Sequence, residues 1–219
     1  MSDRQRFLNK VVIVTGAAQG IGRGVALQVA AEGAQVVLAD LSDYVEETLA
    51  EIEAKDGDAI IIKANLETFA GAQSVVDKAI ETYGRVDALI NNAGVSAHAL
   101  FEQVSAQDLS WYERLMRINL WGSVWCTHAA LPHLKTSKGA IVAVSSLAGL
   151  IGVPGRTAYS ASKFAMTGFF EALRAELKPA GVSVTTAYPG VVDTRIRYHG
   201  YNAKGEAAGV SGLKEDGAM

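Results

Sequence analysis

Residues 11–22 read VVIVTGAAQGIG, in which five β-branched residues lead directly into a turn with three glycines. A continuous β-branched run predicts a strand buried on both faces, and the residues after the turn have helical spacing. Between a strand and a helix, such a turn lets backbone N–H groups approach a pyrophosphate, whose charge the helix dipole favours. Tight packing of the helix on the strand, without a ligand, would also use these glycines.

An acid stands where a dinucleotide site needs one. Asp40 closes the strand predicted at Gln35–Asp40, 18 residues after the last glycine of the turn, and can accept hydrogen bonds from both hydroxyls of an adenosine ribose. Its carboxylate would repel a 2′-phosphate, and neither Gln19 nor Leu41 supplies a compensating charge. Arg23 is close in sequence, but as a helix residue it can be solvated and need not contact a 2′-phosphate. We therefore predict dinucleotide binding, with NAD preferred to NADP; a surface acid at a strand end is the alternative.

The rest of the chain repeats this alternation of strand and helix. Six short runs, most of them continuously apolar, alternate with five helical stretches, which predicts an α/β fold with a doubly wound parallel sheet. The predicted strands are Val11–Thr15, Gln35–Asp40, Ala59–Asn65, Ala88–Asn91, Ala140–Ser145 and Ser183–Tyr188. The predicted helices are Ile21–Glu32, Tyr44–Lys55, Ala70–Tyr83, a long Ala106–Leu134 region and Thr157–Lys178.

Composition excludes several classes of function. The 219 residues suit one large domain, and 20 Lys and Arg against 23 Asp and Glu leave a net charge of -3, which argues against a nucleic-acid-binding face. Cys126 is the only cysteine, so no intramolecular disulfide can form, and the four histidines have no metal-ligand spacing. No apolar run reaches about 18 residues and the polar N-terminus has no signal peptide. We expect a cytoplasmic protein with no metal, nucleic acid or membrane partner.

A tyrosine and a lysine lie four residues apart in the last predicted helix. At this spacing Tyr159 and Lys163 share one helix face. A phenol has a pKa near 10, and lowering it to about 7 takes roughly 4 kcal/mol, part of which a neighbouring ammonium can supply. Ser146, 13 residues before Tyr159, is predicted to end the fifth strand, and the carboxyl end of such a strand faces the ligand crevice. An ordinary tyrosine on an exposed helix is the alternative for the pair alone.

Together with Asn-Asn-Ala-Gly at 91–94 and Tyr-Ser-Ala-Ser-Lys at 159–163, these features resemble the short-chain dehydrogenase/reductase family, in its NAD-preferring main branch, over roughly residues 8–195. The resemblance implies a Rossmann-like sheet of order 3-2-1-4-5-6. It also implies that Lys163 lowers the pKa of Tyr159 and binds the nicotinamide ribose, while Ser146 binds the substrate oxygen. Asn119 would hold a water that links the lysine to solvent. The implied catalytic set is Asn119, Ser146, Tyr159 and Lys163.

The resemblance extends to the cofactor contacts. Asn65 stands where the family usually has an aspartate, and its amide oxygen can still bind the adenine amino group. Pro-Gly-Val-Val-Asp-Thr at 189–194 fits the turn that holds the carboxamide. The implied cofactor-binding set is Gly16, Gln19, Gly20, Ile21, Gly22, Asp40, Asn65, Leu66, Asn92, Ala93, Gly94, Tyr159, Lys163, Pro189, Val192 and Thr194.

The implied function is NAD-dependent interconversion of a secondary alcohol, or a cyclic diol, and a ketone. A non-catalytic dinucleotide-binding module is an alternative. The N-terminal half is similar to cis-diol carboxylate dehydrogenases, whereas the second half is similar to a branch with broad alcohol and carbonyl substrates. The family suggests a homodimer or homotetramer through the fourth and fifth helices. Candidate substrate-pocket residues are Ser96, His98, Leu147, Ala148, Pro154, Arg156 and Tyr188.

The C-terminal end departs from the family pattern. Residues 1–194 are expected to form one catalytic domain, and 195–219 a partial substrate-covering segment rich in glycine. No apolar run remains for the family's usual seventh strand. A truncated or engineered chain with impaired substrate closure is therefore a further alternative.

Overall fold

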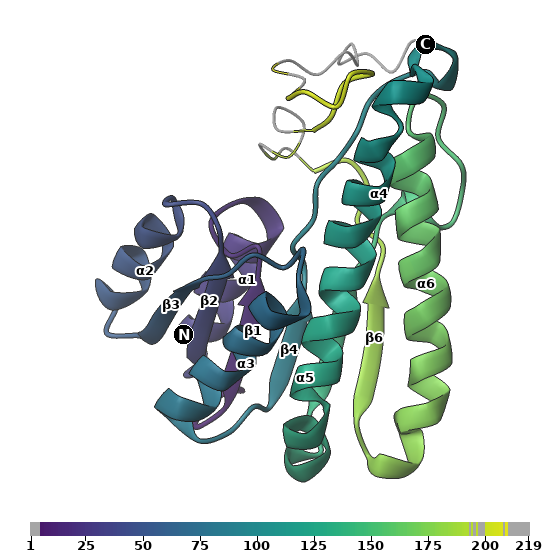
Figure 1. Ribbon diagram of the computed structural model, residues 1–219. Coiled ribbons are helices and arrows are strands. Elements are labelled where there is room, and N and C mark those ends of the chain that lie inside the picture. The colour runs from purple at the N-terminus through teal and green to yellow at the C-terminus, as the bar shows by residue number, and fades with distance from the viewer. Residues whose placement is uncertain (1–4, 193, 195, 197–199, 208, 210–219) are drawn as a thin grey trace.

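A computed structural model describes residues 5–192, 194, 196, 200–207 and 209. Within them, six parallel strands form one sheet in the order β3-β2-β1-β4-β5-β6, as the resemblance implied (Figure 1). Each neighbouring pair is parallel and in register, for example Val14 opposite Leu38 and Val14 opposite Ile90. The strands are β1 (Val11–Thr15), β2 (Gln35–Asp40), β3 (Asp58–Lys63), β4 (Ala88–Asn91), β5 (Ala140–Val144) and β6 (Ser183–Ala187).

Helices cover both faces of the sheet. On one face, α3 (Phe69–Tyr83), α5 (Gly122–Ser137) and α6 (Thr157–Leu177) pack against alternate strand residues such as Ile13 and Ile141. On the other, α1 (Gly20–Ala31) and α2 (Val45–Glu53) pack against Val14 and Leu38 (Figure 1). Because each central strand is buried on both sides, its residues form a continuous apolar run.

Three predicted boundaries were wrong in ways that bear on the site. Strand β3 ends at Lys63, because Asn65 already forms a turn in which its Oδ1 accepts from the backbone N–H of Glu67 at 2.9 Å. Strand β5 ends at Val144, so Ser146 lies beyond the strand. The long region predicted at Ala106–Leu134 begins with a 3-10 turn (Ala106–Asp108) and then continues as α4 (Ser110–Met116), a π-helical turn (Arg117–Trp121) and α5. Periodicity does not distinguish a π turn from an α-helix.

Most of the predicted covering segment, 195–219, lies outside the described residues. Its described part returns to the body of the domain: the backbone N–H of Tyr201 donates to Ser96 O, and the N–H of His98 donates to Tyr201 O, both at 2.9 Å. Tyr201 packs with Trp111 and Leu115 in a small separate core. Across the described ranges, no strand lies beyond β6 in the sheet. None of the helices described here is long and apolar enough to traverse a bilayer.

Candidate active site

The glycine-rich turn has a backbone that requires glycine. Gly16 and Gly20 have φ of +67° and +57°, the left-handed region in which a side chain is strained. Gly22 lies under the turn, where a Cβ would stand 2.1 Å from the carbonyl oxygen of Gly16. The three glycines therefore let α1 begin directly against the turn, and the N-terminus of a helix is a place that favours an anion.

The motif after β4 supports this turn from beneath. The side-chain amide of Asn92 donates to the carbonyl oxygens of Thr15 at 2.9 Å and Gly16 at 3.1 Å. In return, the Thr15 hydroxyl oxygen accepts from the backbone N–H groups of Asn92 and Ala93, each at 3.0 Å. Asn92 thus holds the turn in shape, a role that is visible only once β1 and β4 lie side by side.

Asp40 stands at the carboxyl end of β2 beside the same turn. Its Oδ2 accepts from the backbone N–H of Ala18 and its Oδ1 from that of Ser42, both at 2.9 Å. A carboxylate has about four lone-pair positions, so acceptor capacity remains for two ribose hydroxyls. Arg23 forms an ion pair with Glu51 of α2.

The turn, Asp40 and three of the predicted catalytic residues, Ser146, Tyr159 and Lys163, line one continuous cavity of about 630 Å³ along the carboxyl ends of the strands. This is the crevice in which open α/β sheets bind their ligands. Gln19 lines the cavity, and its Oε1 is buried with no hydrogen-bond partner among the described residues. An extended, glycine-lined cavity with an acid at one end and an unpaired polar atom on its wall fits a dinucleotide.

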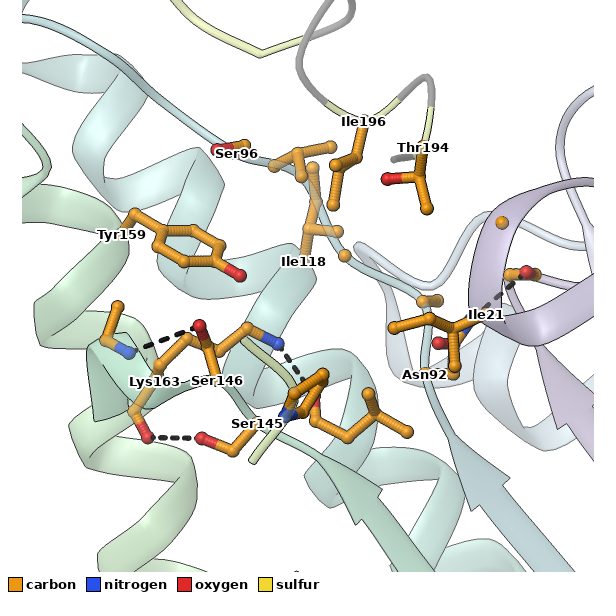
Figure 2. A pocket seen from close by; sticks show the side chains of 18 of the residues that line it. Ile21, Asn92, Ser96, Ile118, Ser145, Ser146, Tyr159, Lys163, Thr194 and Ile196 are labelled. Atoms are coloured by element: carbon orange, nitrogen blue, oxygen red, sulfur yellow. Dashed lines mark hydrogen bonds between the residues drawn. The ribbon is translucent and has the colours of Figure 1, made fainter. Parts of the chain in front are cut away.

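Tyr159 and Ser146 meet at the other end of this cavity. Figure 2 shows the Tyr159 hydroxyl pointing into the cavity near Ser146, with Thr194 and Ile196 on the far side. Burial raises the pKa of Tyr159, while hydrogen bonding by the Ser146 hydroxyl and the positive charge of Arg156 act to lower it. The Ser146 oxygen also accepts from the backbone N–H of Ala148 at 3.2 Å, which fixes its position at the start of a 3-10 turn.

Lys163 is buried below Tyr159. Its Nζ donates to the carbonyl oxygen of Val144 at 2.9 Å and lies 5.8 Å from the centroid of the Tyr159 ring. Burial lowers the pKa of Lys163 to about 8. The positive charge that acts to lower the pKa of Tyr159 against its burial is that of Arg156. The effect of Lys163 on Tyr159 stays a prediction from the family resemblance.

Asn119 lies in the π-helical turn and is fully buried. Its Oδ1 accepts from the backbone N–H of Val95 at 2.8 Å, and its Nδ2 donates to Val95 O and Ser162 Oγ, each at 3.0 Å. A Cβ on Gly94 would lie 3.0 Å from Asn119 Oδ1 and 3.8 Å from Lys163 Nζ, so glycine is what lets these groups approach. Through its hydrogen bonds to Val95 and Ser162, Asn119 connects the segment after β4 to α6.

Nearly all predicted site residues come together. The lining of the cavity includes Gly16, Gln19, Gly20, Ile21, Asp40, Asn65, Leu66, Asn92, Ala93, Gly94, Ser146, Tyr159, Lys163, Pro189, Val192 and Thr194. Gly22 and Asn119 do not line it, because they support it from behind. Of the candidate substrate residues, Ser96, Leu147, Ala148 and Arg156 are in the wall, whereas His98, Pro154 and Tyr188 are not.

The sequence reasoning missed apolar wall residues. Ile118 precedes Asn119 in the π-helical turn, and Ile151 and Val153 follow Ser146 in the loop before α6. Their nearness in sequence to predicted catalytic residues could have indicated them. Tyr201 had no such signal, because only backbone pairing with the 96–98 segment brings it to the cavity.

Within the described ranges, no three His, Cys, Asp or Glu side chains are grouped so as to hold a metal ion.

Comparison with known proteins agrees with this geometry. Residues 10–203 match the family described as short chain dehydrogenase. The chain is 44% identical over 194 residues to 1,6-dihydroxycyclohexa-2,4-diene-1-carboxylate dehydrogenase of Acinetobacter baylyi, covering 87% of this chain and 72% of the relative. It is 40% identical over 195 residues to 11-beta-hydroxysteroid dehydrogenase-like 2 of Arabidopsis thaliana, covering 87% and 61% respectively. This chain thus spans less than two thirds of the plant relative.

A solved structure is also similar. The short chain dehydrogenase/reductase of Burkholderia phymatum in complex with NAD superposes with a TM-score of 0.82 at 31% identity, over 90% of this chain and 70% of that one. The match of the family over most of the chain agrees with the glycine-rich turn and with the Ser-Tyr-Lys arrangement around one cavity. The chain belongs to the short-chain dehydrogenase family, and with it to the oxidoreductases that act on CH–OH groups.

Proposed function

We propose that this chain oxidises a secondary alcohol, or a cyclic diol, to a ketone with NAD, and catalyses the reverse reduction. The observation that carries the proposal is the single cavity that joins Asp40 and the glycine-rich turn to Tyr159 and Ser146. A ribose-binding acid and a phenol that can exchange a proton are then parts of one site. A module that only binds a dinucleotide would not need the phenol.

Each residue has a distinct role in the proposal. Ser146 donates a hydrogen bond to the substrate oxygen, and Tyr159 takes the hydroxyl proton during oxidation and returns it during reduction. Nicotinamide, when bound, supplies the acceptor for the hydride. Lys163 binds the nicotinamide ribose and favours the phenolate, and Asn119 positions α6 through Ser162. The homo-oligomer and the cytoplasmic location predicted from the sequence stay predictions.

The proposal is tested by screening purified protein for NADH formation from NAD⁺ with cyclic diols, steroids and aliphatic secondary alcohols. The relatives' names place 1,6-dihydroxycyclohexa-2,4-diene-1-carboxylate and an 11-beta-hydroxysteroid in the panel. We expect turnover with at least one class. Saturable NADH binding without turnover of any alcohol or carbonyl compound would instead support the non-catalytic module.

The preference for NAD depends on the charge of Asp40. Asp40→Asn keeps an acceptor oxygen but removes the charge that repels a 2′-phosphate, while Arg23 stays paired with Glu51. We expect the ratio of kcat/KM for NAD⁺ to that for NADP⁺ to fall by about 10- to 100-fold, since a charged hydrogen bond contributes roughly 1.5–3 kcal/mol. Asp43→Asn removes a carboxylate from the exposed surface just after β2 and serves as the control. An unchanged ratio in Asp40→Asn would assign the preference to other residues.

The direction of the reaction should depend on pH through Tyr159. Burial raises the pKa of this phenol above its ordinary value, so at neutral pH the proton-bearing form is favoured. Oxidation needs the phenolate and reduction needs the phenol. We expect kcat/KM for alcohol oxidation to rise toward alkaline pH and that for ketone reduction to fall, measured in overlapping buffers at constant ionic strength. Parallel profiles in both directions would contradict the assignment.

A further inference from the structure

Asn65 lies beside the acid that is proposed to bind the ribose. Strands β2 and β3 pair in register as far as Asp40 opposite Lys63, and Asn65 follows shortly after Lys63, in the turn before α3. Asn65 and Asp40 both line the cavity. A dinucleotide whose adenosine ribose binds Asp40 therefore has the base of that nucleoside within reach of Asn65.

The cavity wall at this end is largely apolar. Leu41 follows Asp40 and Leu66 follows Asn65 in the chain, and both leucines line the cavity. Apolar walls fit the faces of a purine ring, whereas a small number of polar groups fixes the orientation and the identity of a ligand. The hydrogen-bonding atoms of Asn65 thus bear on which base binds here.

The backbone of Asn65 is fixed by the turn that it begins. Its carbonyl oxygen accepts from the backbone N–H of Thr68 at 3.4 Å and from the Thr68 hydroxyl at 3.3 Å. Thr68 in turn caps α3, because its hydroxyl oxygen accepts from the N–H of Gly71 at 3.1 Å. A Cβ on Gly71 would lie 1.9 Å from the carbonyl oxygen of Asn65. The start of α3 therefore sets the point from which the Asn65 side chain extends.

The same turn sets the orientation of the Asn65 amide. Its Oδ1 accepts from the backbone N–H of Glu67 at 2.9 Å. The flipped amide would direct the N–H groups of Nδ2 at that backbone N–H, donor against donor, so the oxygen faces the turn. The oxygen that we expected from the sequence to bind the adenine amino group thus has a partner already. Nδ2 has two N–H donors, and no group among the described residues accepts from it.

We propose that Asn65 donates a hydrogen bond to the base of the cofactor, so that the chain binds dinucleotides with a 6-oxopurine base as well as those with adenine. The inference rests on the proposed function for the presence of a dinucleotide in the cavity. An N–H donor suits the carbonyl oxygen of a 6-oxopurine or a ring nitrogen of adenine, but not the adenine amino group, which is itself a donor. A carboxylate at this position would instead select the amino group.

Two reduced dinucleotides test this assignment by binding alone. NADH carries adenine, and its deamino form carries hypoxanthine, in which a carbonyl oxygen replaces the amino group at position 6. Both have the same fluorescent nicotinamide, so fluorescence titration of the full chain measures each Kd without turnover. For the unaltered chain we expect the two Kd values to agree within about 3-fold, because a neutral donor finds an acceptor on either base.

Asn65→Asp replaces the donor by a charged acceptor and keeps an oxygen for the N–H of Glu67. We expect this variant to bind NADH about 10-fold or more tightly than deamino-NADH, since a carboxylate attracts the amino group and repels the carbonyl oxygen. Asn202→Asp is the matched control. Its Oδ1 accepts from the backbone N–H of Lys204 at 2.9 Å in a similar turn, and Asn202 does not line the cavity. It should keep the ratio of the unaltered chain.

Two results would overturn the assignment and leave the dehydrogenase function standing. The first is a preference of about 10-fold or more for NADH in the unaltered chain, because Oδ1 would then bind the amino group through its second lone pair. The second is the same ratio in Asn65→Asp as in the unaltered chain. The expected ratios without oxidation of any alcohol would support the assignment and contradict the dehydrogenase function. A chain that binds neither dinucleotide would contradict both.

Discussion

Tyr159→Phe is expected to lower kcat/KM for alcohol oxidation by about 10³-fold while the chain still binds NADH, since general acid–base catalysis contributes roughly 10²–10⁴-fold. The substitution removes one oxygen atom, the one that points into the cavity beside Ser146 (Figure 2). No hydrogen bond from that hydroxyl holds the glycine-rich turn, whose contacts come from Thr15 and Asn92. Catalysis and cofactor binding should therefore separate cleanly.

The measurement combines steady-state kinetics with titration of NADH fluorescence. Tyr83→Phe is the control, because it makes the same chemical change at the end of α3, where the hydroxyl donates to Asp58 at 2.8 Å away from the cavity. If the turnover of Tyr159→Phe were within a factor of about ten of that of the unaltered chain, the effect would be too small for the loss of a general acid or base. That result would refute the role of Tyr159 in proton transfer.

Lys163→Met is expected to lower turnover by about 100-fold or more and, at the same time, to stabilise the fold. Lys163 is surrounded by protein, which lowers its pKa from 10.5 to about 8. Below pH 8 the folded state holds a charged lysine that the unfolded chain would solvate better. The poorer solvation of this charge destabilises the folded state by at most roughly 3 kcal/mol. Methionine has a similar length and carries no charge, although it leaves the carbonyl oxygen of Val144 without its donor.

We therefore expect a net gain of about 1–2 kcal/mol in the free energy of unfolding, or a few degrees in Tm. The sign follows from linkage: between pH 8 and 10.5 the unfolded chain binds more protons at this site, so the stability of the unaltered chain rises with pH. The advantage of Lys163→Met should be full below about pH 8 and should reverse by about pH 10.5, where the charge no longer costs anything and only the lost hydrogen bond to Val144 remains.

Thermal unfolding of both chains across this pH range provides the check, with the exposed Lys135→Met as the matched control. If Lys163→Met were less stable than the unaltered chain at pH 7, the hydrogen bond to Val144 would outweigh the cost of the buried charge. The expected result, in which Lys163 lowers stability but is needed for activity, is common at functional sites.

The elements that the sequence predicts well are those whose signal is local. Strands β1, β2 and β4 were predicted to the residue, because a continuous β-branched or apolar run bounded by turn residues is what a doubly buried parallel strand requires. The π-helical turn that contains Asn119 was not predicted, because one additional residue per turn leaves the apolar periodicity almost unchanged. Strand β3 was placed two residues too far along the chain at its end, because the side-chain turn of Asn65 interrupts it after Lys63.

The candidate site follows the same division. The sequence alone determined the parallel α/β fold, the strand and glycine-rich turn at 11–22 and the placing of Tyr159 and Lys163 on one helix face, since each depends on residues that are close in sequence. Only the tertiary structure decided that Lys163 is buried, that the charge of Arg156 acts on Tyr159 and that Tyr201 lines the cavity. Desolvation and charge depend on which distant segments pack around a side chain, and that information exists only after the chain has folded.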